Sequence, residues 1–224
     1  MRKSALPTLL ATGLVAAAAA TASTQALAYG EGDFFTRVGI AHVSPKSDNG
    51  DLDLPELGLG LPVLGTDVDD DTNLGFTLGY RFHDKLGIEL LAALPFKHDI
   101  NVGDGGATGS TKHLPPTVTL QYYPLGGTDA RVQPYAGIGL NYTRFFDEKA
   151  TVHALGDAEV DLDLDSSWGA AGQLGADVLI NDNWAVNAAA WYIDIDTDAS
   201  IEGVDVGTVN IDPWVFMAGF SYRF

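Results

Sequence analysis

The chain has 224 residues, of which 30 are acidic and 12 are basic, and its formal net charge is −18. This negative charge argues against nucleic acid as a partner, because phosphates require a basic surface. The sequence contains no cysteine, which excludes disulfides and thiol chemistry. The length fits a single domain that follows a short N-terminal segment.

The first 28 residues have the pattern of a cleaved secretory signal. Arg2 and Lys3 form a basic start, an apolar run extends from Leu9 to Ala20, and Ala26-Leu27-Ala28 matches the A-x-A cleavage site. The alternative is a membrane anchor, but the run is shorter than the ~20 residues that span a bilayer. We predict a signal peptide over residues 1–28 and a mature domain over 29–224, in which no run is long enough for a transmembrane helix.

In the first half of the mature chain, apolar side chains alternate with small or polar ones. Leu74, Phe76 and Leu78 share one parity, whereas Gly75 and Thr77 share the other. Successive side chains of a strand point to opposite faces, so this alternation predicts strands with one apolar face. The pattern predicts strands over residues 34–43, 73–82, 86–94 and 117–123.

The second half repeats the pattern and predicts strands over residues 135–143, 168–180, 184–192 and 214–224. The last segment is the clearest, because one parity carries Trp214, Phe216, Phe220, Tyr222 and Phe224. An apolar face with aromatic residues at both ends is typical of a strand between lipid and a polar lumen. A terminal Phe is also how bacterial outer-membrane barrels usually end.

The connections between these segments alternate in length. Residues 83–85, 124–130 and 181–183 form short turns, whereas residues 44–72, 96–116, 144–167 and 194–212 form long, acidic loops. Short periplasmic turns and long extracellular loops are the arrangement of outer-membrane barrels, and a soluble sandwich would not alternate its loops in this way. We predict an all-β fold, an eight-stranded antiparallel transmembrane β-barrel in the outer membrane of a Gram-negative cell.

Several segments resemble the outer-membrane protein W (OmpW) family. They follow one another along the whole mature chain and lie at residues 34–39, 89–96, 113–117, 133–143, 167–173, 191–196 and 212–216. The resemblance implies an eight-stranded barrel with a narrow hydrophobic channel for passive uptake of small apolar molecules.

The resemblance also implies a ligand site. In that family an apolar pair floors the pocket, and this role carries over to Leu91 in the third strand and Trp191 in the seventh. Both residues fall on the inward parity. An inward Leu and Trp suit an apolar ligand, but they would also fill a barrel too narrow to conduct.

A second inward set lies towards the short-turn ends of the strands. Opposite charges there are expected to pair, because an unpaired buried charge is costly. We predict a polar plug that closes the periplasmic end, so that an apolar ligand would leave sideways between strands. The predicted plug residues are Arg37, Arg81, Glu89, Gln121, Asp177 and Arg223.

The long loops carry runs of acids and, in the first loop, of leucines. The acidic runs are Asp67 with Asp69–Asp71, Asp161 to Asp165, and Asp194 to Asp198. Clustered oxygens suit calcium, but the EF-hand spacing is absent, so we predict a solvated surface without a metal site. This surface could share divalent ions with lipopolysaccharide, the expected partner beside lipid. Leu52, Leu54, Leu57, Leu59, Leu61, Val63 and Leu64 could line an entrance or pack on one another.

Two classes of function remain open. One is the channel, and the other is a non-conducting structural barrel that acts at the cell surface through its acidic loops. No enzyme is predicted, because the histidines (His42, His83, His98, His113, His153) lie mostly near strand ends or in loops, and no catalytic triad can be placed. No cofactor is predicted either, and no oligomeric state.

Overall fold

The computed structural model describes residues 30–46, 48–53, 63–103, 106–153 and 156–224. The predicted signal peptide and the leucines at positions 54, 57, 59 and 61 lie outside these ranges. No helix within the described ranges has the length and hydropathy needed to cross a membrane. The helices and strands assigned within these ranges are all strands.

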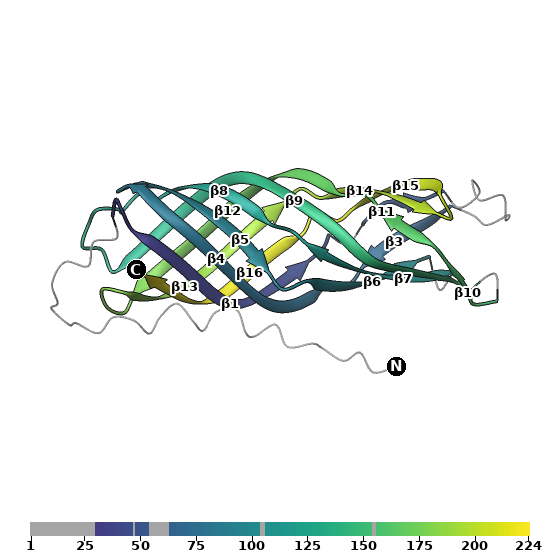
Figure 1. Ribbon diagram of the computed structural model, residues 1–224, viewed down its shortest axis with the longest axis horizontal. Helices are drawn as coiled ribbons and strands as arrows, with labels where there is room; N and C mark the ends of the chain where they lie inside the picture. The colour runs from purple at the N-terminus through teal and green to yellow at the C-terminus, as the bar shows by residue number, and fades with distance from the viewer. Residues whose placement is uncertain (1–29, 47, 54–62, 104–105, 154–155) are drawn as a thin grey trace, which may run out of the picture.

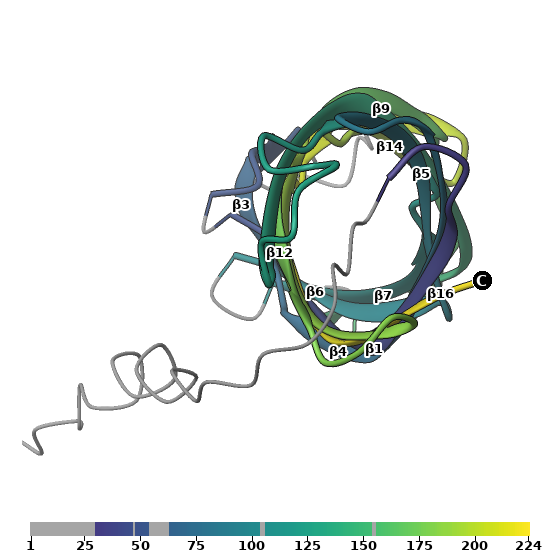
Figure 2. The same ribbon diagram turned by 90° about the vertical axis from the view of Figure 1, so that its left-hand side faces the viewer.

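Eight of the strands form a closed antiparallel barrel, as predicted (Figures 1 and 2). Each pairs with the next along the ring, and the first and last close it through the pairing of Phe35–Ser44 with Trp214–Arg223. Figure 2, seen along the barrel, shows the ring of strands. The eight strands are β1 (Phe34–Ser44), β4 (Asp71–His83), β5 (Leu86–Ala93), β8 (Thr117–Tyr122), β9 (Val132–Val152), β12 (Ser167–Leu179), β13 (Trp184–Ile193) and β16 (Trp214–Arg223).

The outer face of the barrel is apolar and the inner face is small or polar, as the alternation predicts. Phe76 and Leu78 are exposed, whereas Gly75 and Thr77, which alternate with them, are buried. Aromatic pairs mark both ends of the apolar band: Trp184 stacks edge-on against Tyr222 at the short-turn end. At the other end the pairs are Tyr142 with Trp168 and Tyr192 with Trp214. Two aromatic girdles around an apolar band fit the two interfaces of a bilayer.

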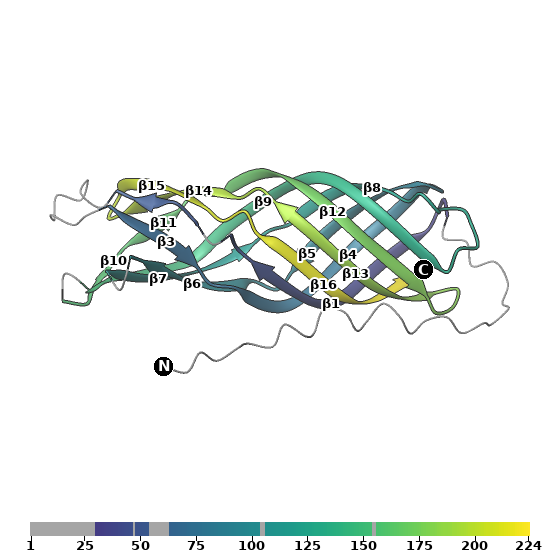
Figure 3. The ribbon, with the colours of Figure 1, turned by 180° about the vertical axis from the view of Figure 1, so that it is seen from behind.

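The four long connections, predicted as loops, are largely strands that extend the barrel wall (Figures 1 and 3). The physical reason is that the two-residue alternation continues, with acids and lysines in place of lipid-facing side chains. In β6, for example, Phe96, His98 and Ile100 are buried, and Lys97 and Asp99 are exposed. The added strands are β2 (Asp51–Leu52), β3 (Leu64–Val68), β6 (Phe96–Val102), β7 (Ala107–Leu114), β10 (Ala158–Val160), β11 (Leu162–Leu164), β14 (Asp196–Ile201) and β15 (Val204–Asn210).

The largest difference from the predicted boundaries is in β9. The prediction ends that strand at Thr143, but the strand has 21 residues and continues to Val152. Its lower part pairs with β8 and its upper part with β7, which belongs to the extension. The strand therefore runs from the membrane into the extracellular part and joins the two.

Closure of the ring depends on glycine at the β1–β16 seam. Gly39 and Gly219 lie opposite each other, and a Cβ atom on Gly219 would lie 2.1 Å from the Val38 carbonyl oxygen. The outward-facing Gly172 gives a matched control, because a Cβ atom there meets nothing within 4 Å.

We expect Gly219→Ala to lower the free energy of unfolding by about 1–3 kcal/mol, the usual cost of forcing extra atoms into a packed site. Gly172→Ala should change it by less than about 0.5 kcal/mol. Denaturant titration in lipid, followed by heat-modifiable migration on gels, measures both. Equal stability of the two variants would contradict the role of close backbone approach at this seam.

Candidate functional site

A buried ion-pair network crosses the lumen near the short-turn end. The guanidinium of Arg37 on β1 pairs with the carboxylates of Glu89 on β5 and Asp177 on β12. The contact with Asp177 uses two atoms of the guanidinium, Nη2 at 2.6 Å and Nε at 3.2 Å. Because all three side chains are at most 1% exposed, the ion pair is shielded from bulk water, and it joins strands from three parts of the ring.

Neutral side chains fill the remaining hydrogen-bonding capacity of the two carboxylates. Glu89 accepts hydrogen bonds from the Thr77 hydroxyl and from the amides of Gln121 and Gln173, each at 2.8 Å. Asp177 accepts one from the Asn187 amide at 2.9 Å. Buried ions are tolerated when their remaining hydrogen-bonding capacity is filled in this way. The network therefore forms one cross-linked polar layer.

The structure brings four of the six predicted plug residues into this network: Arg37, Glu89, Gln121 and Asp177. Arg81 lies nearer the turn, where its guanidinium carbon is 3.8 Å from the Tyr123 ring centre and it donates to the Asp84 carbonyl. Arg223 pairs with Asp33 at 3.2 Å at the partly exposed rim. These two arginines thus flank the layer on its periplasmic side.

The prediction missed Gln173 and Asn187 as members of the layer, although both have inward parity. Gln173 donates to Glu89, and Asn187 donates both to Asp177 and to the Tyr135 hydroxyl. The signals that point to this layer are their inward parity, the place of Gln173 at the middle of β12 and that of Asn187 in the turn-side half of β13. Sequence alone does not give the relative height of neighbouring tilted strands, which decides these contacts.

Leu91 and Trp191 lie directly above the polar layer, on its extracellular side. Leu91 is the next inward position after Glu89 on β5, and Trp191 follows Asn187 and Ala189 on β13. Both are buried, with 4% and 0% of their surface exposed. Trp191 Nε1 has no hydrogen-bond partner among the described residues. The pair marks the change from a polar to an apolar lumen.

One apolar cluster leads from this pair to the extracellular end. It includes Leu91, Trp191, Val215, Val152 and Val209, and it belongs to both the barrel and the extension. The extension strands thus contribute to the same interior as the membrane strands.

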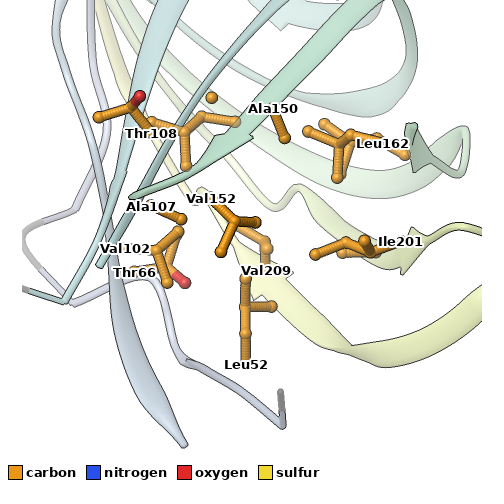
Figure 4. A pocket seen from close by; sticks show the side chains of 14 residues that line it. Leu52, Thr66, Val102, Ala107, Thr108, Ala150, Val152, Leu162, Ile201 and Val209 are labelled. Carbon is orange, nitrogen blue, oxygen red and sulfur yellow. The ribbon is translucent and has the colours of Figure 1, made fainter. Parts of the chain in front are cut away.

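The cluster ends in a small apolar cavity between the extracellular hairpins (Figure 4). Val152, Val209 and Leu52 line it, and Leu52 comes from the first long connection. Its free volume is about 40 Å³, so a ligand of more than a few atoms must displace side chains. Thr66 and Thr108 are the polar residues of the lining. The rest of the lining is apolar, which makes the cavity suitable for an apolar guest.

The acidic runs lie mostly on the outer surface of the extension. Asp161, Asp163 and Asp165 are exposed. Asp194, Asp196 and Asp212 bring carboxylate oxygens within 4.8 Å of one another. Lys46 donates to Asp212 at 2.9 Å and compensates part of this charge, while burial and the neighbouring acids raise the pKa of Asp196. These positions fit a solvated acidic face.

We expect Arg37→Met to lower the free energy of unfolding by about 3–5 kcal/mol, because it leaves two buried carboxylates without a counter-ion. Adding Glu89→Gln and Asp177→Asn should restore part of this loss. Lys97→Met, which removes an exposed pair with Asp99, should change stability by less than about 1 kcal/mol. Denaturant titration in lipid measures all three, and equal losses for Arg37→Met and Lys97→Met would show that the layer has no special role in stability.

The sequence matches the OmpW family over residues 30–224. It is 43% identical over 222 residues to outer membrane protein W of Vibrio cholerae, a match that covers 94% of this chain and 97% of that one. The crystal structure of OprG from Pseudomonas aeruginosa has a TM-score of 0.78 and 43% identity, over 89% of this chain and 99% of that chain.

A more distant relative is the dibenzothiophene metabolism operon protein PahQ of Pseudomonas aeruginosa. It is 29% identical over 148 residues, which cover 64% of this chain and 65% of that protein. The barrel, its girdles and the match over nearly the whole described chain agree with one another. The chain belongs to the OmpW family and is a β-barrel of the outer membrane.

Proposed function

We propose that the barrel is a passive conduit for small apolar molecules, with the extracellular cavity as its entrance and Leu91 and Trp191 as the floor that contacts the ligand. The observation that carries this proposal is the single apolar cluster between the cavity and the floor. An apolar lining stabilises an apolar guest relative to water. The name of the relative PahQ, a protein of dibenzothiophene metabolism, supports an apolar substrate.

The polar layer makes a straight path into the periplasm unfavourable. An apolar molecule passing between Arg37, Glu89 and Asp177 would break an ion pair that water cannot replace there. In this proposal the network is the plug of the lumen, and the ligand leaves sideways above it.

The wall has a gap in its hydrogen bonding at that level. The β5–β8 pairing ends at Leu91 and Thr117, and the β6–β7 pairing begins at Phe96 and His113. Pro95, Pro115 and Pro116 lie between these ends and have no N–H to donate. A lateral exit between these two segments therefore breaks no ladder hydrogen bond, and it lies next to Leu91 of the proposed floor.

The second candidate is a non-conducting barrel that acts through its acidic outer surface. The full burial of Trp191 and the small volume of the cavity favour it, since both also fit an interior that is simply filled. The two candidates differ in whether changes inside the lumen alter uptake.

Uptake of a small alkane tracer into liposomes distinguishes them. We expect the native barrel to accelerate tracer uptake over empty liposomes. A Leu91→Arg, Trp191→Ala double variant should reduce this acceleration about tenfold or more, because a buried charge opposes an apolar ligand by several kcal/mol. Leu125→Arg with Trp184→Ala is the matched control on exposed positions, and it should keep the native rate. No acceleration by the native barrel would reject the conduit.

The cavity gives an independent test on a single strand. Val209 on β15 lines the cavity, whereas Val204 on the same strand is exposed. We expect Val209→Asp to lower tracer uptake about tenfold or more, and Val204→Asp to leave it unchanged, for the same desolvation reason. Both variants should keep heat-modifiable migration. Equal uptake by the two would show that the cavity is not on the path.

A further inference from the structure

Two histidines of the extension form a buried pair inside the lumen. His98 on β6 and His113 on β7 stack with ring centroids 4.8 Å apart and an angle of 23° between the planes. Phe96 and Phe145 lie against His113, at 5.6 and 6.0 Å between ring centroids. Each histidine is only 2% exposed. The pair is therefore shielded from water although it lies above the membrane band.

The hydrogen bonds of the pair are incomplete. His98 Nδ1 lies 2.5 Å from the Asp69 carbonyl oxygen, which can only accept, so Nδ1 carries the hydrogen and Nε2 carries a lone pair. Neither His98 Nε2 nor His113 Nδ1 has a partner among the described residues. A proton added to either ring would place a charge in an apolar site beside a second imidazole, which is costly.

The pair lies beside the seam between β6 and the turn that joins β3 to β4. The bonds across this seam are His98 to the Asp69 carbonyl, the Asp69 N–H to the Asp99 carbonyl at 3.0 Å, and the Lys97 N–H to the Asp71 carboxylate at 2.8 Å. Beyond them β6 pairs regularly with β3, from Val68 opposite Ile100 to Thr66 opposite Val102. This seam begins beside the proline gap described above.

We propose that His98 and His113 form an acid-sensitive latch, which holds β6 against the β3–β4 turn while both rings are neutral and releases it when they gain protons. The carboxylates of Asp69, Asp70 and Asp71 lie along the turn and already act on His98 in the closed state, so they are the charged partners that the released, protonated ring would meet. The proposed latch sets the pH at which the seam opens, and it does not depend on the chemistry of the molecule that passes.

The carboxylates of Asp69, Asp70 and Asp71 favour a charge on His98, but burial opposes that charge more strongly. His113 faces His98, Phe96 and Phe145, and the one titratable group that acts on its charge is His98. His42 on β1 lies 3.6 Å from the Asp70 carboxylate. Most other charged residues of β6, β7 and the facing part of β9 have the outward parity or are exposed: Lys97, Asp99, Lys112, Arg144, Asp147 and Lys149. Glu148 on β9 is half-buried, and burial raises its pKa.

The direction of the pH effect follows from burial. Burial lowers the pKa of His98, and burial together with the neighbouring His98 lowers the pKa of His113 well below its ordinary value. The open or unfolded state then binds more protons than the closed state once the pH falls below about 6.5. The closed seam is fully stable above that pH and loses stability progressively as the pH falls through the lowered pKa values.

Hydrogen exchange of the seam amides tests the latch in the native barrel in lipid nanodiscs. We expect the protection factors of the Asp69 and Lys97 amides to fall on the order of tenfold between pH 7.5 and 5, the effect of one unit of pKa difference. Amides of the β12–β13 ladder should keep their protection. Unchanged protection at the seam would overturn the proposal.

Variants assign the effect to the pair. His98→Gln with His113→Phe keeps a donor for the Asp69 carbonyl and an aromatic ring in the stack, and should abolish the acid-induced fall. His153→Gln, an exposed histidine near the end of β9, is the matched control and should retain it. A fall that persists in the double variant would overturn the latch even if the double variant is less stable overall.

The consequence for uptake rests on the proposed function. If the lumen conducts apolar molecules, tracer uptake should be faster at pH 5 than at pH 7.5 in the native barrel and independent of pH in the double variant. Loss of seam protection without any uptake at either pH would leave the latch intact and reject the conduit. Uptake that is equal at both pH values, with unchanged protection, would reject the latch and leave the conduit intact.

Discussion

The arrangement of the lumen depends on one interaction, the contact of Arg37 with Glu89 and Asp177. It joins β1, β5 and β12 across the barrel, and it can persist without water because Gln121, Gln173 and Asn187 fill the remaining hydrogen-bonding capacity. Such a layer excludes apolar molecules from below and leaves the space above to apolar side chains. The position of this layer therefore decides where the interior changes character, at Leu91 and Trp191.

A second constraint, the two-residue alternation, explains why the apolar interior is longer than the membrane band. From Leu91 and Trp191 upwards, the inward residues of β6 and β15 are apolar apart from His98, while outward residues change from aromatic and aliphatic to charged, mostly acidic ones. The outer face of one continuous wall is thus apolar where it meets lipid and charged where it meets water. The bulk of the negative charge is a property of this upper outer face, and the apolar cavity is a property of the inner one.

The strands, their outward faces and the depth of Arg37, Glu89, Gln121 and Asp177 follow from parity and position in the chain, so sequence predicts them. The extracellular strands were missed because acids such as Asp99 and Asp163 look like loop residues when burial of the neighbouring residues is unknown. The separate places of Arg81 and Arg223, and the stacking of His98 on His113, depend on the relative heights of tilted strands. Pairing registers such as Phe96 with His113 supply that information, and no local pattern does.

The central claim is that apolar molecules occupy the lumen above the polar layer and do not reach into it. The most direct measurement is methyl and indole NMR of the barrel in nanodiscs while a small alkane is added. The account predicts shifts of Leu91, Trp191, Val152 and Val209, with saturation, and no change at Gln121 or Asn187. Shifts confined to lipid-facing methyls such as Leu78 and Leu140 would contradict it, as would shifts that extend through the Arg37 layer.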